Sequence, residues 1–154
     1  MELQINYDYR ESDLIDLPLH ELAYFVLKHQ EKPENTEVSL TFVDDEEIAR
    51  LNETYRGIEG PTDVLSFECD GVDDEMSDLV GVEDAEVFEL GDIVIAPDVA
   101  ERQTAQFGTT FEQEVNLLFV HGLLHLCGYD HIVEEEAQVM EALEDEILNA
   151  WYAR

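Results

Sequence analysis

The sequence predicts an α+β fold, a small four-stranded mixed sheet packed with helices around one central helix. Residues 2–9 and 37–43 alternate apolar and polar side chains, which is the period of half-buried strands, and two further short segments are also predicted to be strands. A continuous apolar run over residues 115–126 is long enough for a helix and has too few polar side chains for a surface one, so it belongs at the centre. A chain of 154 residues is the size of one domain with one core, and we expect a single domain over residues 1–154.

The four strands are predicted over residues 2–9, 37–43, 63–67 and 90–96. Helices are predicted over residues 19–30, 45–55, 98–106, 115–126 and 134–154, each with apolar positions at helical spacing. The last of these has one apolar and one acidic face, which predicts ordinary packing and no chemistry.

Helix starts follow from capping residues. Asp44 with Glu47, and Thr110 with Gln113, have the spacing of a capping box. Asp16 is a candidate cap for the first helix, whose first turn can hold Pro18. In the helix after Asp44, we expect Ile48, Leu51 and Tyr55 to be buried.

The charge balance is extreme. Thirty-nine acidic and seven basic side chains give a formal net charge of -32, which argues against partners that need a broad basic surface, including anionic membranes and duplex DNA. Residues 68–90 carry ten acids and predict a solvated insertion; their spacing matches no calcium loop.

The cellular location of the protein is predicted from features that its sequence lacks. No apolar run reaches the length of a membrane span, and the first residues lack the pattern of a signal peptide. Cys69 and Cys127 do not suggest a disulfide framework, so we expect a cytoplasmic location.

Three of the five histidines lie in one stretch of the chain. His121 and His125 are four residues apart and share a helix face, and Gly128 lets the chain turn so that His131 returns to the same spot. Three neutral imidazoles with an open fourth position form a catalytic zinc site. We therefore expect one Zn²⁺ ion per chain, although other transition metals also accept imidazole. His20 and His29 lie off the apolar stripe of their helix and are expected at the surface.

The spacing equals that of the metzincin proteases, but Gly122 stands where those enzymes carry the glutamate that acts as general base. A glycine inside a helix costs about 1 kcal/mol relative to alanine. We therefore expect Gly122 to mark a close approach of substrate or backbone.

Arg56 is the candidate residue for binding a phosphate. It ends a predicted helix beside a glycine-rich loop, where backbone can approach a ligand, although a cation there also suits the helix dipole. Asp130 could orient a histidine. Cys127 follows His125 by two residues and is expected to be a small buried side chain facing away from the metal.

Three separated motifs together resemble the YbeY family: Tyr55-Arg56 with Pro61-Thr-Asp-Val-Leu-Ser-Phe67, then Leu90-Gly-Asp-Ile-Val-Ile95, then the segment from His121 to His131. The resemblance covers nearly the whole chain. It implies a bacterial metal-dependent, single-strand-specific endoribonuclease that acts in ribosomal RNA maturation (16S rRNA 3′ end processing) and ribosome quality control.

By the resemblance, the zinc ligands are His121, His125 and His131, and the catalytic residues are Arg56 and His121, with residues 61–67 near the cleft. It further implies RNA, as an rRNA precursor, and the ribosome or ribosomal proteins as partners. The low number of cations in this chain departs from what a nuclease is expected to offer to phosphates.

Two other classes of function stay open. One is a metal-dependent peptidase or amidohydrolase, suggested by the metzincin spacing and disfavoured by the missing glutamate. The other is a non-catalytic ribosome-assembly factor with a structural zinc, which normally needs a fourth protein ligand.

Overall fold

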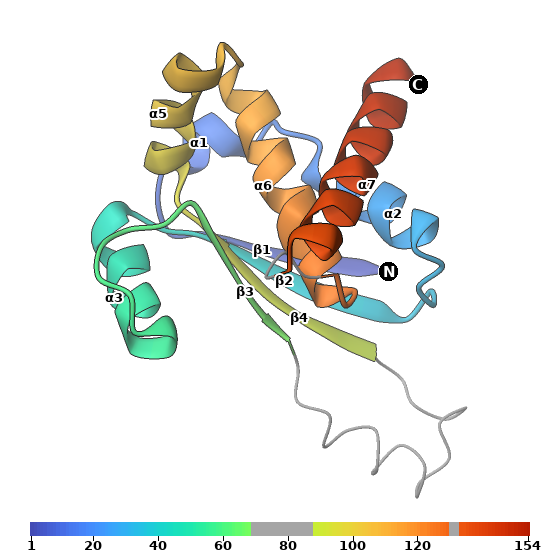
Figure 1. Cartoon of the computed structure of the whole chain (residues 1–154), viewed down its shortest axis with the longest axis horizontal. Coiled ribbons are helices and arrows are strands. Elements are labelled where there is room, and N and C mark those ends of the chain that lie inside the picture. Colours follow the sequence, from blue (N-terminus) through green and yellow to red (C-terminus); the bar gives the residue numbers. More distant parts are fainter. Residues whose placement is uncertain (69–87, 130–132) are drawn as a thin grey trace, which may run out of the picture.

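The computed structural model describes residues 1–68, 88–129 and 133–154, and it confirms the α+β fold (Figure 1). The strands form one sheet in the order β1-β2-β4-β3. β1, β2 and β4 run parallel and β3 runs antiparallel to β4, so the sheet is mixed as predicted. The strand bounds are Glu2–Tyr7 for β1, Thr36–Phe42 for β2, Val64–Glu68 for β3 and Phe88–Ile95 for β4.

Helices cover both faces of the sheet because successive strand residues point to opposite sides. Ile93 and Ile95 face the larger core, which contains α6 (Phe111–Leu126), α2 (Leu19–His29) and α7 (Glu134–Ala153). Val94 lies between them and faces a smaller core under α3 (Asp45–Arg56). In Figure 1, α6 runs between the sheet and α7, which is the central position predicted for it.

The central helix is buried over nearly its whole length, including Phe119, Val120 and Leu123. Its start is fixed by the predicted capping box, in which the Thr110 hydroxyl accepts from the Gln113 N–H and the Gln113 side chain accepts from the Thr110 N–H. Before it, α5 (Pro97–Phe107) ends at Gly108 in the left-handed conformation.

Two local predictions at helices were wrong. Asp16 does not cap α2: Pro18 is the N-cap residue, and its carbonyl accepts from the Leu22 N–H, which leaves Asp16 two residues too early. A short helix that was not predicted, α1 (Glu11–Leu14), precedes it. The Asp44 cap is confirmed, since its side chain accepts from the Glu47 N–H.

Tyr55 is exposed rather than buried. Asn52 takes the buried position on that face of α3 and donates to the Gly60 carbonyl, while the Tyr55 ring packs edge-on against Phe67 of β3, with centroids 5.3 Å apart. Tyr55 lies at the helical spacing expected of a core residue, but its ring packs against the edge strand β3 instead of the core.

Both ends of the predicted acidic loop belong to strands, because Glu68 ends β3 and β4 begins at Phe88. The rest of it, residues 69–87 with Cys69, lies outside the described residues. His20 and His29 are exposed, as predicted, and Cys127 is a free thiol. Within the described ranges, no helix combines the length and the apolar composition needed to span a membrane.

Candidate active site

A cleft of about 600 Å³ opens where the edge strand β3 meets α6 and the end of α3. Figure 1 shows β3 running between α3 and α6. The cleft brings together residues that the sequence analysis singled out from two distant segments. Its lining comprises Tyr55, Arg56, Thr62, Asp63, Val64, Leu65, Ser66, Phe67, His121, Gly122 and His125.

Two imidazoles meet on the α6 side of this cleft. The Nε2 atoms of His121 and His125 lie 3.1 Å apart, and the two rings are edge-on with centroids 4.7 Å apart. The separation of four residues along α6 places both side chains on one face, as predicted. His131, the third predicted ligand, lies outside the described residues, as does Asp130.

Nδ1 of His121, the ring nitrogen that does not face His125, contacts a carboxylate that was not predicted from the sequence. His121 Nδ1 hydrogen-bonds Glu144 Oε1 on α7, and Glu144 is only 7% exposed. When the Nδ1–H donates to this carboxylate, the neutral ring carries its lone pair on Nε2, the atom that faces His125. The contact therefore fixes the tautomer and the direction of His121 from a different helix.

A signal for Glu144 was present in the sequence. It lies at helical spacing from Met140, Ile147 and Trp151, all of which are buried. An acid on the apolar stripe of a helix is rarely buried unless it has a partner. The interpretation of α7 as packing without chemistry was therefore incomplete.

Gly122 faces the sheet at close range. A Cβ added there would lie 3.0 Å from Ile93 Cγ2 and 3.2 Å from Ile93 Cδ1. The close neighbour of Gly122 within the fold is thus an apolar side chain of β4, where we had expected substrate or backbone. A longer side chain at position 122, including a glutamate, would require Ile93 to move.

Arg56 is the last residue of α3 and is exposed at the cleft. The chain then turns through Gly57, which adopts the left-handed conformation at φ 68°. Within the described residues, no carboxylate or aromatic ring contacts the Arg56 guanidinium, whereas Arg10, Arg50 and Arg102 are each ion-paired. This guanidinium is therefore available to an anion in the cleft.

Asp63 holds the strand that forms the other wall. Its Oδ1 accepts from the Val64 N–H at 2.8 Å, and its Oδ2 accepts from Gln103 Nε2 of α5 at 3.1 Å. These contacts anchor the start of β3 and give Asp63 a structural role.

The thiol of Cys127 follows α6 and is half-buried. Burial raises its pKa, and the nearby positive charge of Lys32 opposes that effect. A thiol with a raised pKa is a poor nucleophile. Cys127 is thus a small side chain that is half-buried, where burial was predicted.

Paired imidazoles and an available guanidinium at one open cleft, on an α+β fold, are typical of a hydrolase that acts on an anionic substrate. The model of the family described as Endoribonuclease YbeY matches residues 4–152. The chain therefore belongs to the endoribonuclease YbeY family.

Curated relatives agree over most of the chain. Endoribonuclease YbeY of Heliobacterium modesticaldum is 48% identical over 134 residues, covering 86% of this chain and 80% of the relative. Endoribonuclease YbeY of Thermoanaerobacter sp. (strain X514) is 41% identical over 152 residues, covering 95% of this chain and 96% of the relative. The solution structure of TM1509 from Thermotoga maritima has a TM-score of 0.60 and 28% identity, over 98% of this chain and 92% of that one.

Proposed function

We propose that this chain is a metal-dependent endoribonuclease specific for single-stranded RNA, and that the cleft between β3 and α6 is its active site. The observation that carries the proposal is the paired Nε2 atoms of His121 and His125 in the same cleft as the Arg56 guanidinium. Family membership supports the RNA-cleaving activity and an rRNA precursor as substrate, with 16S rRNA 3′ end processing and ribosome quality control as its setting.

The donor set fits a zinc ion. His121 and His125 would hold it through their Nε2 atoms, since the Glu144 carboxylate occupies Nδ1 of His121, and we propose His131 as the third ligand. A bound zinc ion supplies Lewis acidity and lowers the pKa of a coordinated water toward neutrality. Neutral imidazole also suits nickel, copper and iron.

The chain's own groups do the remaining work. Arg56 binds a phosphate oxygen through its planar guanidinium and stabilises the charge that develops there. Glu144 keeps His121 in one tautomer and orientation. Asp63 and Gln103 hold β3 so that its backbone forms a fixed wall beside the substrate.

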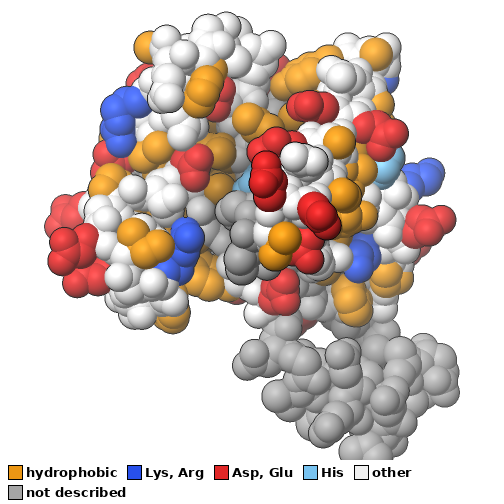
Figure 2. Space-filling model, viewed as in Figure 1, with side chains coloured by type: hydrophobic (Ala, Val, Ile, Leu, Met, Phe, Trp, Pro, Cys, Tyr) orange, Lys and Arg blue, Asp and Glu red, His pale blue; other side chains and the backbone are white. Residues whose placement is uncertain are grey.

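We propose that residues 1–154 act as one cytoplasmic domain whose partners are RNA and the ribosome or its proteins. In Figure 2, acidic side chains are scattered over the visible face and basic ones are few. A surface of this charge favours a basic partner protein, such as a ribosomal protein, that delivers the RNA.

The peptidase alternative finds little support in the contacts of Gly122. That class needs a glutamate at this position, and a side chain there would meet Ile93. A structural zinc would need a fourth protein ligand, whereas the paired imidazoles line an open cleft. Neither alternative gains a specific observation in its favour.

The experiment measures metal content and cleavage in the same preparations of untagged protein. The substrates are a labelled single-stranded RNA, its duplex form and a peptide mixture. His121→Ala is the test variant, and Gln106→Ala, which removes an exposed polar side chain of α5 outside the cleft, is the control.

We expect one zinc per chain and cleavage of the single strand by the wild type and by Gln106→Ala. His121→Ala should lose cleavage and most of its zinc. Zinc without cleavage of any RNA would favour the assembly factor, and peptide cleavage would favour the peptidase. Protein that binds no metal would refute the proposed mechanism.

A further inference from the structure

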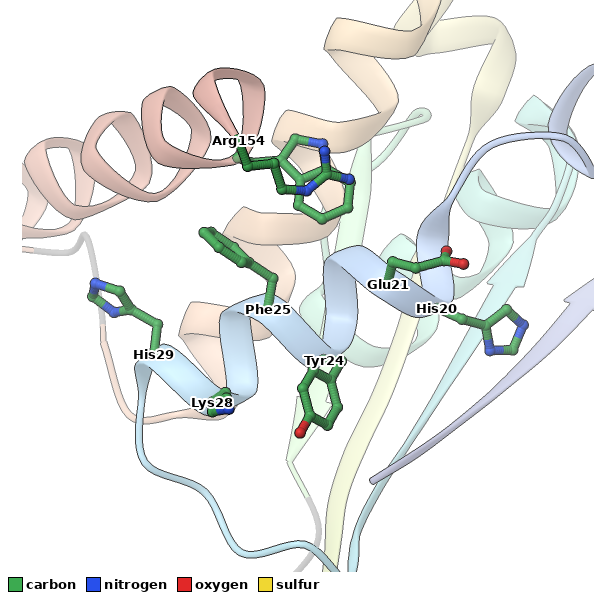
Figure 3. Close-up of a pocket in the computed structure, with 8 residues that line it drawn as sticks. His20, Glu21, Tyr24, Phe25, Lys28, His29 and Arg154 are labelled. Carbon is green, nitrogen blue, oxygen red and sulfur yellow. The ribbon is translucent and has the colours of Figure 1, made fainter.

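A second hollow, of about 770 Å³, lies between α2 and the C-terminal end of α7. Figure 3 shows its side chains. Phe25 projects from α2 toward the end of α7, where Arg154 lies, and Tyr24 projects from another side of α2. The residues that line it include Tyr24, Phe25, Lys28, His29, Trp151 and Arg154, none of which lines the cleft. The hollow is therefore a separate surface.

Its cations lie on aromatic rings. The Arg154 guanidinium carbon is 3.3 Å from the Trp151 ring centroid, and Lys28 Nζ is 5.7 Å from that of Tyr24. Phe25 packs edge-on against Trp151, with centroids 5.5 Å apart. Cation–aromatic contacts hold these charges in place without neutralising them.

The two cations of the hollow are not paired with carboxylates of the described residues. In a chain with 39 acids and seven Lys or Arg, neither Lys28 nor Arg154 forms an ion pair with any described residue. Among the described residues that line the hollow, only Glu21 has a carboxylate side chain, and Glu146 of α7 contacts the His29 imidazole at 3.7 Å. By contrast, Arg10, Arg50 and Arg102 are each bound to acids. The positive charge of the hollow is therefore available to an anionic ligand.

A third cation also lies on an aromatic ring, and α7 connects the hollow to the active site. Lys32 follows the end of α2, and its Nζ lies 5.9 Å from the Phe88 ring centroid. Along α7, Trp151 lies seven residues beyond Glu144, roughly 10 Å along the helix axis. The hollow therefore lies about two turns of α7 from the residue that contacts His121.

We propose that the hollow between α2 and α7 is a second RNA-binding site, which takes a nucleotide of the single-stranded substrate outside the cleaved bond. The Tyr24 ring, 42% exposed, offers a face on which a base stacks, and Lys28 and Arg154 bind the flanking phosphates. Aromatic faces combined with cations are the features that bind single strands without reading their sequence. The inference rests on the proposed RNA-cleaving function, and it identifies where this acidic protein holds its substrate.

The test compares two pairs of substitutions that remove the same charge. Lys28→Ala with Arg154→Ala removes the two cations of the hollow. Arg50→Ala with Arg102→Ala removes two ion-paired cations elsewhere and is the control. Tyr24→Ala and Tyr24→Phe separate loss of the stacking face from loss of the hydroxyl alone. All variants are measured with a long single-stranded RNA and with a tetranucleotide.

With the long RNA as substrate, the Lys28/Arg154 variant should have a KM about tenfold higher than the wild type and the same kcat. The slope of log affinity against log salt concentration should become shallower by about 1.4, because two phosphate contacts are lost. Tyr24→Ala should raise KM about fivefold and Tyr24→Phe should not. The tetranucleotide, which is too short to occupy both sites, should show no difference. Equal effects in the Arg50/Arg102 control would overturn the proposal, because they would trace to net charge.

Photo-crosslinking of a thiouridine-labelled RNA, read by mass spectrometry, decides the proposal independently of cleavage. Crosslinks to the α2 segment that contains Tyr24 and Phe25, lost in the Lys28/Arg154 variant, support the site even if no RNA is cut, in which case only the proposed function fails. Crosslinks confined to the cleft, with unchanged KM in every variant, would overturn the second site and favour an acidic protein segment as its ligand.

Discussion

Glu144 of α7 contacts Nδ1 of His121 on α6, so the orientation of one catalytic candidate depends on a residue 23 positions away. The carboxylate is buried and the imidazole faces the cleft, which is the arrangement that fixes a metal-binding histidine from behind. The last helix therefore serves the site as well as the core.

Replacing Glu144 by glutamine should weaken zinc binding by about 10- to 100-fold, because the neutral amide can donate as well as accept and so no longer enforces the tautomer with an unprotonated Nε2. Competition with a chelating dye measures this affinity directly. Glu141→Gln, which changes an exposed acid one turn earlier on α7, is the matched control. Thermal unfolding of the metal-free proteins checks that the variant is folded. Equal zinc affinity in all three proteins would show that the contact has no influence on the metal.

Arg56→Ala should lower kcat for RNA cleavage by about 100-fold or more while leaving the zinc content unchanged. The guanidinium stabilises negative charge on the phosphate and does not bind the metal. Arg56→Lys should recover part of the rate, because a lysine keeps the charge but loses the bidentate geometry. Arg50→Ala, on the same helix and paired only with Glu47, is the control for changes in α3. Cleavage by Arg56→Ala at the wild-type rate would remove this residue from the mechanism.

Features set by neighbouring residues could be predicted from the sequence. The strand alternation, the Asp44 and Thr110 caps and the shared face of His121 and His125 all depend on residues within a few positions of one another, and the structure confirms them. The roles of Glu144 and Asp63 could not be found this way, because their partners His121 and Gln103 lie 23 and 40 residues away.

The same distinction explains the errors. The helical period places Tyr55 toward the core, but it cannot show that a ring on β3 is nearer. Gly122 was marked as a site of close approach, yet only the register of α6 on β4 identifies Ile93 as the neighbour. The part played by His131 stays a prediction, since that residue lies outside the described ranges.

Gly122→Ala tests the contact with Ile93. The new Cβ, 3.0 Å from Ile93 Cγ2, should cost about 1–3 kcal/mol through overpacking, and the higher helix propensity of alanine should offset about 1 kcal/mol of that. We expect a net loss of about 1 kcal/mol in the free energy of unfolding, measured by urea denaturation.

Combining Gly122→Ala with Ile93→Ala provides the control. The double variant should lose less stability than the sum of the single variants, because the added methyl group then fills space that the isoleucine vacated. Strict additivity would mean that the two residues do not press on each other.

Three carboxylates lie side by side on the sheet, because Glu2 pairs in register with Glu37, and Glu37 with Glu89. The hydrogen bond that the protonated Glu37 carboxyl donates to the Glu2 carboxylate, together with slight burial and the charges of Glu2 and Glu89, raises the pKa of Glu37 above its usual value. An acid whose pKa is raised by folding binds its proton more tightly in the folded state. Stability is therefore lost as the pH rises through that pKa and is regained below it.

Glu37→Gln should accordingly raise the melting temperature near neutral pH at low salt. The gain should shrink as the pH falls into the carboxyl range, and in concentrated sodium chloride, where the Debye length is only about 3 Å. Differential scanning calorimetry measures the change, with Glu53→Gln, an exposed acid on α3, as the control for net charge. A gain equal to that of the control at every pH and salt concentration would assign the effect to the overall charge of -32 and not to the row of carboxylates on the sheet.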